Sequence, residues 1–133
     1  PCAHGIGVDR SIAACRVASI NAASLGLSHR ASFLASDWGA ALSSRFDIIV
    51  ANPPYVADSA IDALAPEVSR YEPRLALAGG RDGLDAYRRL GTDIPRLLDG
   101  EGFAVIEVGA GMRGAVSTLL GEAGLTLEGV RRD

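Results

Sequence analysis

The sequence predicts an α/β fold, a three-layer sandwich in which helices cover both faces of a mostly parallel sheet. Two observations lead to this prediction. Segments with the apolar pattern of strands alternate with segments of helical periodicity, the order that right-handed βαβ crossovers require. The run Ile48-Ile49-Val50 is also β-branched throughout, which is typical of a strand buried on both faces. The 133 residues, 48% of them hydrophobic, suffice for one soluble globular domain.

The first predicted element is the end of a strand at Gly5–Asp9, and the second is a helix. Ser11 is a suitable N-cap for this helix, which should extend to about Leu25 and be closed by Gly26. One face of it carries residues at helical spacing: Ile12, Cys15, Ala18, Ala22 and Leu25. We therefore interpret Cys15 as a small core residue and not as a nucleophile.

The later elements continue the alternation. Strands are predicted over residues 31–36, 46–51 and 102–108, with a short fifth strand near 125–130. The helix predicted over 84–98 has Asp85 in its first turn. Its apolar side consists of Leu84, Tyr87, Leu90, Ile94 and Leu97. Pro95 should kink this helix or shift its start, because proline lacks the backbone N–H. The last helix covers 113–123 and is closed by Gly124.

The stretch 56–83 breaks this regular order. It contains two prolines and three glycines, at Pro66, Pro73, Gly79, Gly80 and Gly83. A connection of this length in a compact domain usually has a functional role. Since it directly follows the most distinctive motif of the chain, we predict that it is a loop on the substrate side of the site.

That motif is Asn52-Pro53-Pro54-Tyr55, which stops the apolar strand abruptly. Paired prolines cannot continue a strand, so the motif should lie at the carboxyl end of the sheet, where α/β folds bind ligands. The Asn52 side-chain oxygen and the Pro53 carbonyl can each accept one hydrogen of a planar NH2 group. Tyr55 can pack against the plane of that group. A plain turn would favour Gly, Asp and Ser instead.

Charge and composition narrow the classes of function. The net charge is −3, and the largest basic clusters are the pairs Arg88-Arg89 and Arg131-Arg132, which disfavours direct binding to nucleic acid. No apolar run approaches the length of a membrane span, and we expect no membrane contact. Cys2 and Cys15 are too few for a disulfide framework. With no secretory leader visible, we expect the protein to be located in a reducing cytoplasm. We also expect no metal site.

Taken together, the motifs of this chain resemble the HemK/PrmC family. The resemblance covers essentially all 133 residues and adds further segments to Asn52–Tyr55. These segments are Asp9, Asp37-Trp38, Glu67-Val68, Tyr71-Glu72-Pro73, Arg74-Leu75-Ala76-Leu77 and Gly80-Arg81-Asp82-Gly83-Leu84. The family consists of S-adenosylmethionine-dependent enzymes that methylate the glutamine amide in the Gly-Gly-Gln motif of peptide chain release factors. The resemblance implies a class I (Rossmann-like) methyltransferase fold and a cytoplasmic enzyme.

The resemblance also implies roles for single residues. Asp9 would grip the ribose hydroxyls of the cofactor, Trp38 would contact its adenine, and Asp37 would line the same pocket. Asn52, Pro53, Pro54 and Tyr55 would bind the glutamine amide, with Asn52 also close to the transferred methyl group. The implied reaction is a direct in-line displacement at the sulfonium methyl, promoted by orientation and electrostatics. We assign no general base.

The sequence departs from the family pattern in several places. The glycine-rich cofactor loop expected before Asp9 is absent, as are the N-terminal helical domain, the first strand and the last strand of the sheet. We therefore expect residues 1–133 to be a partial catalytic domain, incomplete at both ends. Arg10 replaces an apolar residue, and Met112 stands where the family often has Gln.

Three alternatives remain open at this point. Gly109, Gly111 and Gly114 form a G-x-G-x-x-G pattern that could belong to a dinucleotide-binding oxidoreductase, with Glu128 as the ribose acid. An amino-methyltransferase acting on a nucleobase in DNA or RNA would use the same Asn-Pro-Pro-aromatic device. The chain could also be a degenerate, non-catalytic remnant.

Overall fold

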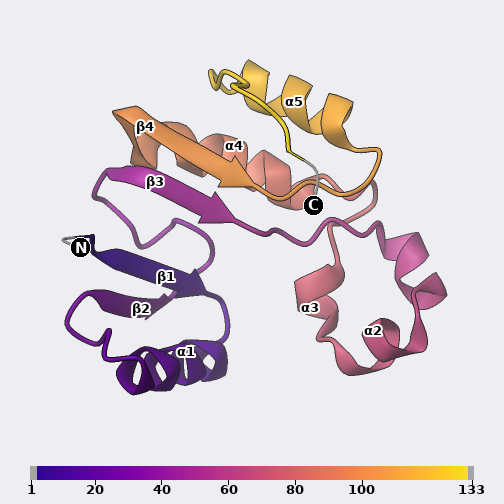
Figure 1. The fold of residues 1–133 in the computed structure, drawn as a ribbon. Coiled ribbons are helices and arrows are strands. Elements are labelled where there is room, and N and C mark those ends of the chain that lie inside the picture. Colours follow the sequence, from indigo (N-terminus) through magenta and orange to yellow (C-terminus); the bar gives the residue numbers. More distant parts are fainter. Residues whose placement is uncertain (1–2, 132–133) are drawn as a thin grey trace. The chain divides into compact units, whose positions relative to one another are not determined.

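The computed structural model describes residues 3–131 and has a mixed α/β fold with parallel strands (Figure 1). The chain divides into two compact units, Pro1–Ser43 and Ser44–Asp133. Each unit contains one pair of parallel strands joined through a helical connection, as the predicted α/β class requires. Within residues 3–131, no helix combines the length and apolar character needed to cross a membrane.

The first unit is a βαβ arrangement of β1 (Gly5–Asp9), α1 (Ile12–Ser24) and β2 (Ala31–Ala35). The two strands are parallel, and their register runs from Gly5 opposite Ala31 to Asp9 opposite Ala35. The predicted N-cap is confirmed, because the Ser11 hydroxyl oxygen accepts a hydrogen bond from the Ala14 N–H at 3.2 Å. Gly26 follows the helix with φ +68°, a conformation that glycine adopts without strain.

The apolar face of α1 is only partly buried. Cys15 and Ala22 belong to the core, which confirms the structural reading of Cys15. The prediction is wrong for the two ends of the face, since Ile12 is 62% and Leu25 is 71% exposed. The described part of the first unit has two strands, so its sheet covers the central stripe of the helix and leaves the flanks open.

The second unit begins with β3 (Phe46–Ala51) and ends with α5 (Arg113–Glu122). Between them lie η1 (Asp58–Ala63), α2 (Pro66–Tyr71), α3 (Arg74–Leu77), α4 (Asp85–Leu97) and β4 (Leu98–Ile106). β3 and β4 run in parallel, with Ile48 opposite Phe103 and Ala51 opposite Ile106 (Figure 1). β4 starts earlier than predicted because Leu98 pairs with Phe46, and the register then shifts before Ile48.

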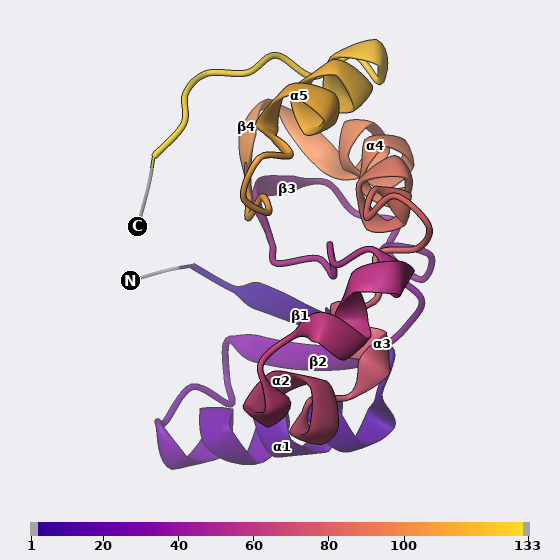
Figure 2. The same ribbon diagram turned by 90° about the vertical axis from the view of Figure 1, so that its right-hand side faces the viewer.

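Helix α4 supplies most of the core of the second unit. Its predicted apolar face is confirmed by the buried residues Tyr87, Leu90, Ile94 and Leu97. The helix starts at Asp85 and continues past Pro95 to Leu97, because a proline in the last turn removes only one of the remaining hydrogen bonds. α5 lies beside α4 in both views, and a Cβ added at Gly91 would meet Leu119 Cδ2 at 3.3 Å (Figures 1 and 2).

Two predictions about strands are wrong. β3 is not buried on both faces, since Ile48 is 53% and Val50 is 74% exposed. β4 pairs with β3 along one edge and α4 packs against β4, whereas nothing in the described part of the second unit covers the face that carries Ile48 and Val50. Residues 125–130 also form no strand, because no segment within 3–131 offers them a ladder of backbone hydrogen bonds.

The stretch 56–83 is more ordered than a loop. It contains η1, α2 and α3, and its two ends are tied together by backbone hydrogen bonds. The Val56 N–H donates to the Leu77 carbonyl at 3.0 Å, and the Gly79 N–H donates to the Val56 carbonyl at 2.8 Å. The stretch 56–83, called the excursion after β3 below, therefore returns to the point where β3 ends. It forms a fixed wall beside Asn52–Tyr55.

Candidate active site

In the first unit, the carboxyl ends of β1 and β2 carry the residues predicted to bind a cofactor. Asp9 is exposed at the last position of β1. Its Oδ1 accepts a hydrogen bond from the Ser11 N–H at 2.7 Å, and its backbone carbonyl accepts one from the Ser36 N–H at 3.0 Å. The carboxylate is thus held at the edge of the sheet where the connection after β2 also begins.

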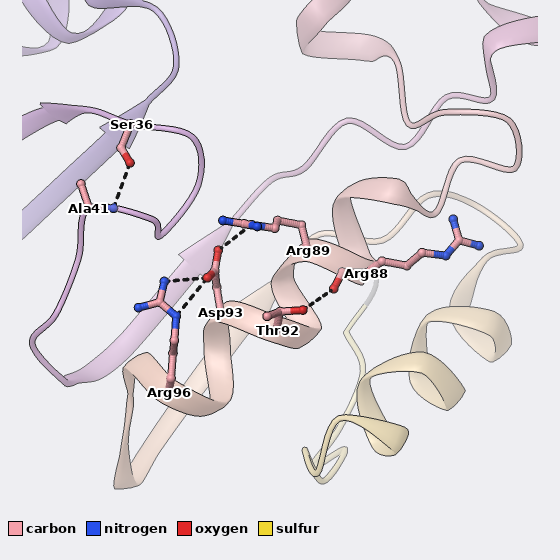
Figure 3. A network of polar contacts seen from close by, with 7 residues as sticks. All are labelled: Ser36, Ala41, Arg88, Arg89, Thr92, Asp93 and Arg96. Atoms are coloured by element: carbon pink, nitrogen blue, oxygen red, sulfur yellow. Dashed lines mark hydrogen bonds and ion pairs between the residues drawn. The ribbon is translucent and has the colours of Figure 1, made fainter.

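Trp38 occupies a strained position in that connection. Its φ is +54°, the only positive value for a non-glycine residue in the described range. The turn is held by two hydrogen bonds. The Ala41 N–H donates to Ser36 Oγ at 3.2 Å (Figure 3), and the Ala40 N–H donates to the Asp37 carbonyl at 3.2 Å. A bulky residue in this region costs about 1–3 kcal/mol and is typical of ligand-binding segments.

In the second unit, the predicted tetrapeptide lines a cavity of about 310 Å³. Pro53 is fully buried beneath the cavity, whereas Asn52 is exposed and Pro54 and Tyr55 are half-buried. Another part of the lining comes from the stretch 56–83. The complete lining consists of Asn52, Pro53, Pro54, Tyr55, Val56, Leu64, Val68, Ala76, Leu77 and Glu107. The stretch 56–83 thus contributes an apolar wall to the cavity that also contains the polar acceptors.

Glu107 is a residue of this cavity that the sequence reasoning did not assign. Its carboxylate Oε1 accepts a hydrogen bond from the Tyr55 hydroxyl at 3.3 Å. Its backbone N–H donates to the Ala51 carbonyl at 2.9 Å, which extends the pairing of β3 and β4 by one residue. The available signal was an acid directly after a strand, because the carboxyl ends of parallel strands meet at one edge.

Tyr87 supports this arrangement from α4. It is fully buried, and its hydroxyl donates to the Glu107 carbonyl at 3.0 Å and accepts from the Gly109 N–H at 3.4 Å. Burial raises the pKa of the Tyr87 phenol, so the group stays protonated and can donate at neutral pH. One buried side chain therefore fixes the start of the turn that leads from β4 into α5.

Gly109 has a packing role that differs from a dinucleotide motif. A Cβ at this position would lie 2.7 Å from Tyr55 Cδ2 and 2.9 Å from Met112 Sδ. The missing side chain therefore makes room for the Tyr55 ring and the Met112 thioether. This contact explains the first glycine of the G-x-G-x-x-G pattern without a pyrophosphate.

Each group of predicted residues is gathered within its own unit. Asp9 shares the carboxyl edge of the β1–β2 sheet with the turn that contains Asp37 and Trp38. The four residues of Asn52–Tyr55 line one cavity together with Glu107. An exposed carboxylate and a half-buried indole that follow neighbouring parallel strands are suited to a nucleoside, and the acceptors of the cavity are suited to an NH2 group.

Parallel α/β units with these residues at the carboxyl ends of their strands are those of a Rossmann-like methyltransferase domain. Comparison with known proteins agrees with this class. Residues 2–72 match the family described as "Methyltransferase small domain". The chain belongs to this family.

The names of its relatives specify a narrower group within this family. A protein named "Release factor glutamine methyltransferase" from Rhodospirillum rubrum is 46% identical over 133 residues, which are all of this chain and 41% of that protein. Proteins of the same name from Cereibacter sphaeroides and Caulobacter vibrioides are 47% and 48% identical over 133 and 127 residues. These matches cover 100% and 95% of the chain, and 48% and 44% of the relatives. The chain thus spans less than half the length of the curated relatives it matches.

Proposed function

We propose that the protein transfers a methyl group from S-adenosylmethionine to the glutamine side-chain amide in the Gly-Gly-Gln motif of peptide chain release factors. The observation that carries the proposal is the cavity in which Asn52–Tyr55 faces an apolar wall. The names of the relatives support the same substrate. The partner is then a protein, with no direct contact to nucleic acid or membrane, and the activity belongs to the cytoplasm. Residues 1–133 would form part of the catalytic domain.

The acceptor side of the proposed site consists of Asn52, Pro53, Pro54 and Tyr55. Asn52 Oδ1 and the Pro53 carbonyl accept the two hydrogens of the amide, and Tyr55 packs on its plane. The cavity volume of about 310 Å³ lies at the small end of the range for ligand sites, as a single side chain requires. The buried ring of Pro53 keeps these acceptors in place.

The donor side of the proposed site consists of Asp9, Asp37 and Trp38, with Asn52 near the methyl group. Asp9 accepts hydrogen bonds from ribose hydroxyls, and the Trp38 indole contacts adenine. The positive φ of Trp38 supports this role, since backbone strain of this kind clusters at ligand sites. Asp37 lines the pocket from the same turn. S-adenosylmethionine, when bound, supplies an electrophilic methyl group on a sulfonium.

The residues of the chain contribute to the reaction by orienting the substrate amide. An amide nitrogen is a weak nucleophile because its lone pair is delocalised into the carbonyl. Acceptors on both hydrogens leave the nitrogen free only along the direction normal to the amide plane, and they stabilise the positive charge that develops on it. The new N–C bond forms as the S–C bond breaks, and one N–H proton leaves the product for water. No general base is required.

The test is methylation of a release factor by the intact protein and its Asn52→Ala variant. We expect a loss of at least about 100-fold in turnover, as for other preorganised hydrogen-bond partners. Asn21→Ala on the exposed surface of α1 is the matched control and should leave turnover unchanged. Near-normal turnover by Asn52→Ala would overturn the assigned role, and preferential methylation of an oligonucleotide would replace the protein substrate by a nucleobase.

A further inference from the structure

The polar edge of the cavity contains one carboxylate, Glu107, and this group points to the tyrosine of the motif. Glu107 Oε1 accepts the hydrogen bond of the Tyr55 hydroxyl at 3.3 Å, and both residues line the same cavity. The two residues are separated by 52 positions in the chain, so the contact exists only because β3 and β4 end side by side.

Glu107 is itself held by two backbone hydrogen bonds from different elements. Its N–H donates to the Ala51 carbonyl of β3 at 2.9 Å, and its carbonyl accepts from the Tyr87 hydroxyl of α4 at 3.0 Å. The carboxylate therefore projects from a backbone that cannot shift freely. A hydrogen bond to an ionised acceptor is stronger than one between neutral groups.

The Tyr55 ring is confined on its other side as well. Gly109 lies against the ring, since a Cβ added there would be 2.7 Å from Tyr55 Cδ2, and this close approach limits movement of the ring toward Gly109. The remaining motion is a sideways swing of the whole ring about the Cα–Cβ bond, which changes where its face lies against an amide. The hydrogen bond to Glu107 restrains this swing because it holds the hydroxyl end of the ring in place.

We propose that Glu107 is a positioning residue of the methyl-transfer site and acts through the Tyr55 hydroxyl. This inference rests on the proposed function, because it assigns Tyr55 to the acceptor amide. It predicts that the carboxylate sets the orientation of the aromatic ring against that amide and takes no proton from the substrate.

A double-mutant cycle in the intact protein tests this role. Glu107→Ala and Tyr55→Phe should each lower kcat/KM for a release factor about tenfold, the value of one charge-assisted hydrogen bond. The double variant should also lose about tenfold, because both substitutions remove the same contact. Glu107→Gln retains an acceptor oxygen and should recover most of the activity.

Donor affinity and folding provide the readouts that separate a positioning role from a general structural one. The dissociation constant for S-adenosylmethionine and the circular dichroism spectrum should stay at parental values in all these variants. Glu101→Gln, an exposed acid on the same strand β4, is the matched control and should leave kcat/KM unchanged.

The outcomes are distinct. A loss of about 100-fold in the double variant, or an equal loss in Glu107→Gln and Glu107→Ala, would overturn the positioning role and make Glu107 a group that contacts the substrate. A parental protein that methylates no glutamine would instead refute the proposed function.

Discussion

Glycine residues next to Tyr55 set the shape of the candidate site at the scale of single residues. Gly83 has φ +78°, and a Cβ there would lie 2.5 Å from the Tyr55 carbonyl oxygen. The backbone of the excursion therefore passes within contact distance of the motif, where only glycine fits. Gly111 has a similar φ of +80° but open space around the Cβ position. The two positions separate the effect of backbone strain from the effect of a close approach.

We expect Gly83→Ala to destabilise the protein by about 3 kcal/mol, since strain and displacement of Tyr55 act together. Gly111→Ala should cost only about 1–2 kcal/mol, the strain alone. Urea unfolding of both variants measures the difference. Equal losses in the free energy of unfolding at the two positions would show that the backbone at Tyr55 can move without cost. Gly83→Ala should also lower the rate of methyl transfer.

Tyr87 offers a second test at this scale. Tyr87→Phe leaves the ring in place but removes the hydroxyl that joins the Glu107 carbonyl to the Gly109 N–H. We expect a loss of about 1–2 kcal/mol in the free energy of unfolding, because the buried Gly109 N–H and the partly buried Glu107 carbonyl lose their partner. Tyr71→Phe is the control, since Tyr71 is 83% exposed. A parental stability for Tyr87→Phe would mean that water replaces the hydroxyl.

Sequence reasoning at the residue scale succeeds where the chemistry is local. Asn52–Tyr55 could be identified because four consecutive residues carry the acceptors and the aromatic ring, and the cavity contains all four. Glu107 could not be assigned in the same way. Its role depends on which strand pairs with β3, and Glu107 lies 52 residues after Tyr55 in the chain.

The element α4 combines an apolar face with a buried acid. Asp93 is 4% exposed, and its carboxylate accepts hydrogen bonds from Arg89 Nε at 3.2 Å and from Arg96 Nη2 at 2.6 Å (Figure 3). Both arginines lie on the same helix, three or four residues away. A buried charge is tolerated because its partners neutralise it within one element.

We therefore expect Asp93→Asn to destabilise the protein by about 1–3 kcal/mol, because the two guanidinium groups lose their buried acceptor. The half-exposed arginines can turn to water, which keeps the loss below that of a fully buried ion pair. Thermal unfolding measures the change, with Asp99→Asn at an exposed position as the control. Similar melting temperatures for the two variants would contradict a stabilising role for the cluster.

The stability that the start of α4 contributes to the fold should depend on pH. A side-chain hydrogen bond from Arg88 lowers the pKa of Asp82 from 3.8 to about 2. A carboxylate with a lowered pKa in the folded state adds stability above pH 3.8, and this stability is lost as the pH falls from 3.8 toward 2. Asp82→Asn should therefore reduce the difference in urea midpoint between pH 5 and about pH 2, and high salt should shrink the effect.

Asp47→Asn, at an exposed position on β3, serves as the control for that experiment. It removes a carboxyl group without removing the bidentate contact between Asp82 and Arg88, whose shortest distance is 2.6 Å. The same reduction of the pH effect in Asp47→Asn would show that net charge, and not this ion pair, determines the acid sensitivity.

Sequence patterns predicted the elements better than their partners. Helix α1 and its cap followed from Ser11 and Gly26, because capping is a property of adjacent residues. The strand expected at 125–130 could not be decided in this way. A strand forms only when a neighbour satisfies its N–H and C=O groups, and this information lies elsewhere in the chain. The short helices within 56–83 were missed because the five prolines and glycines of that stretch favour turns and loops.

At the scale of the whole molecule, the described chain has an apolar sheet face without a cover in the second unit. Ile48 and Val50 of β3 stand opposite Phe103 and Val105 of β4, and each is more than half exposed. We call these four residues the open sheet face. The unalternated run Ile48-Ile49-Val50 predicted a strand buried on both sides, and the open sheet face is the side for which residues 44–131 provide no cover.

Such a face should bind hydrophobic probes, because exposed apolar side chains that are contiguous attract other apolar groups. We expect a chain of residues 1–133 to enhance the fluorescence of an apolar dye, and Val50→Thr combined with Val105→Thr to reduce it severalfold. Threonine keeps the β-branched shape, so the circular dichroism spectrum should not change. Val130→Thr, at an exposed position outside the strands, is the control. Unchanged dye binding by the double variant would mean that the open sheet face is covered in solution.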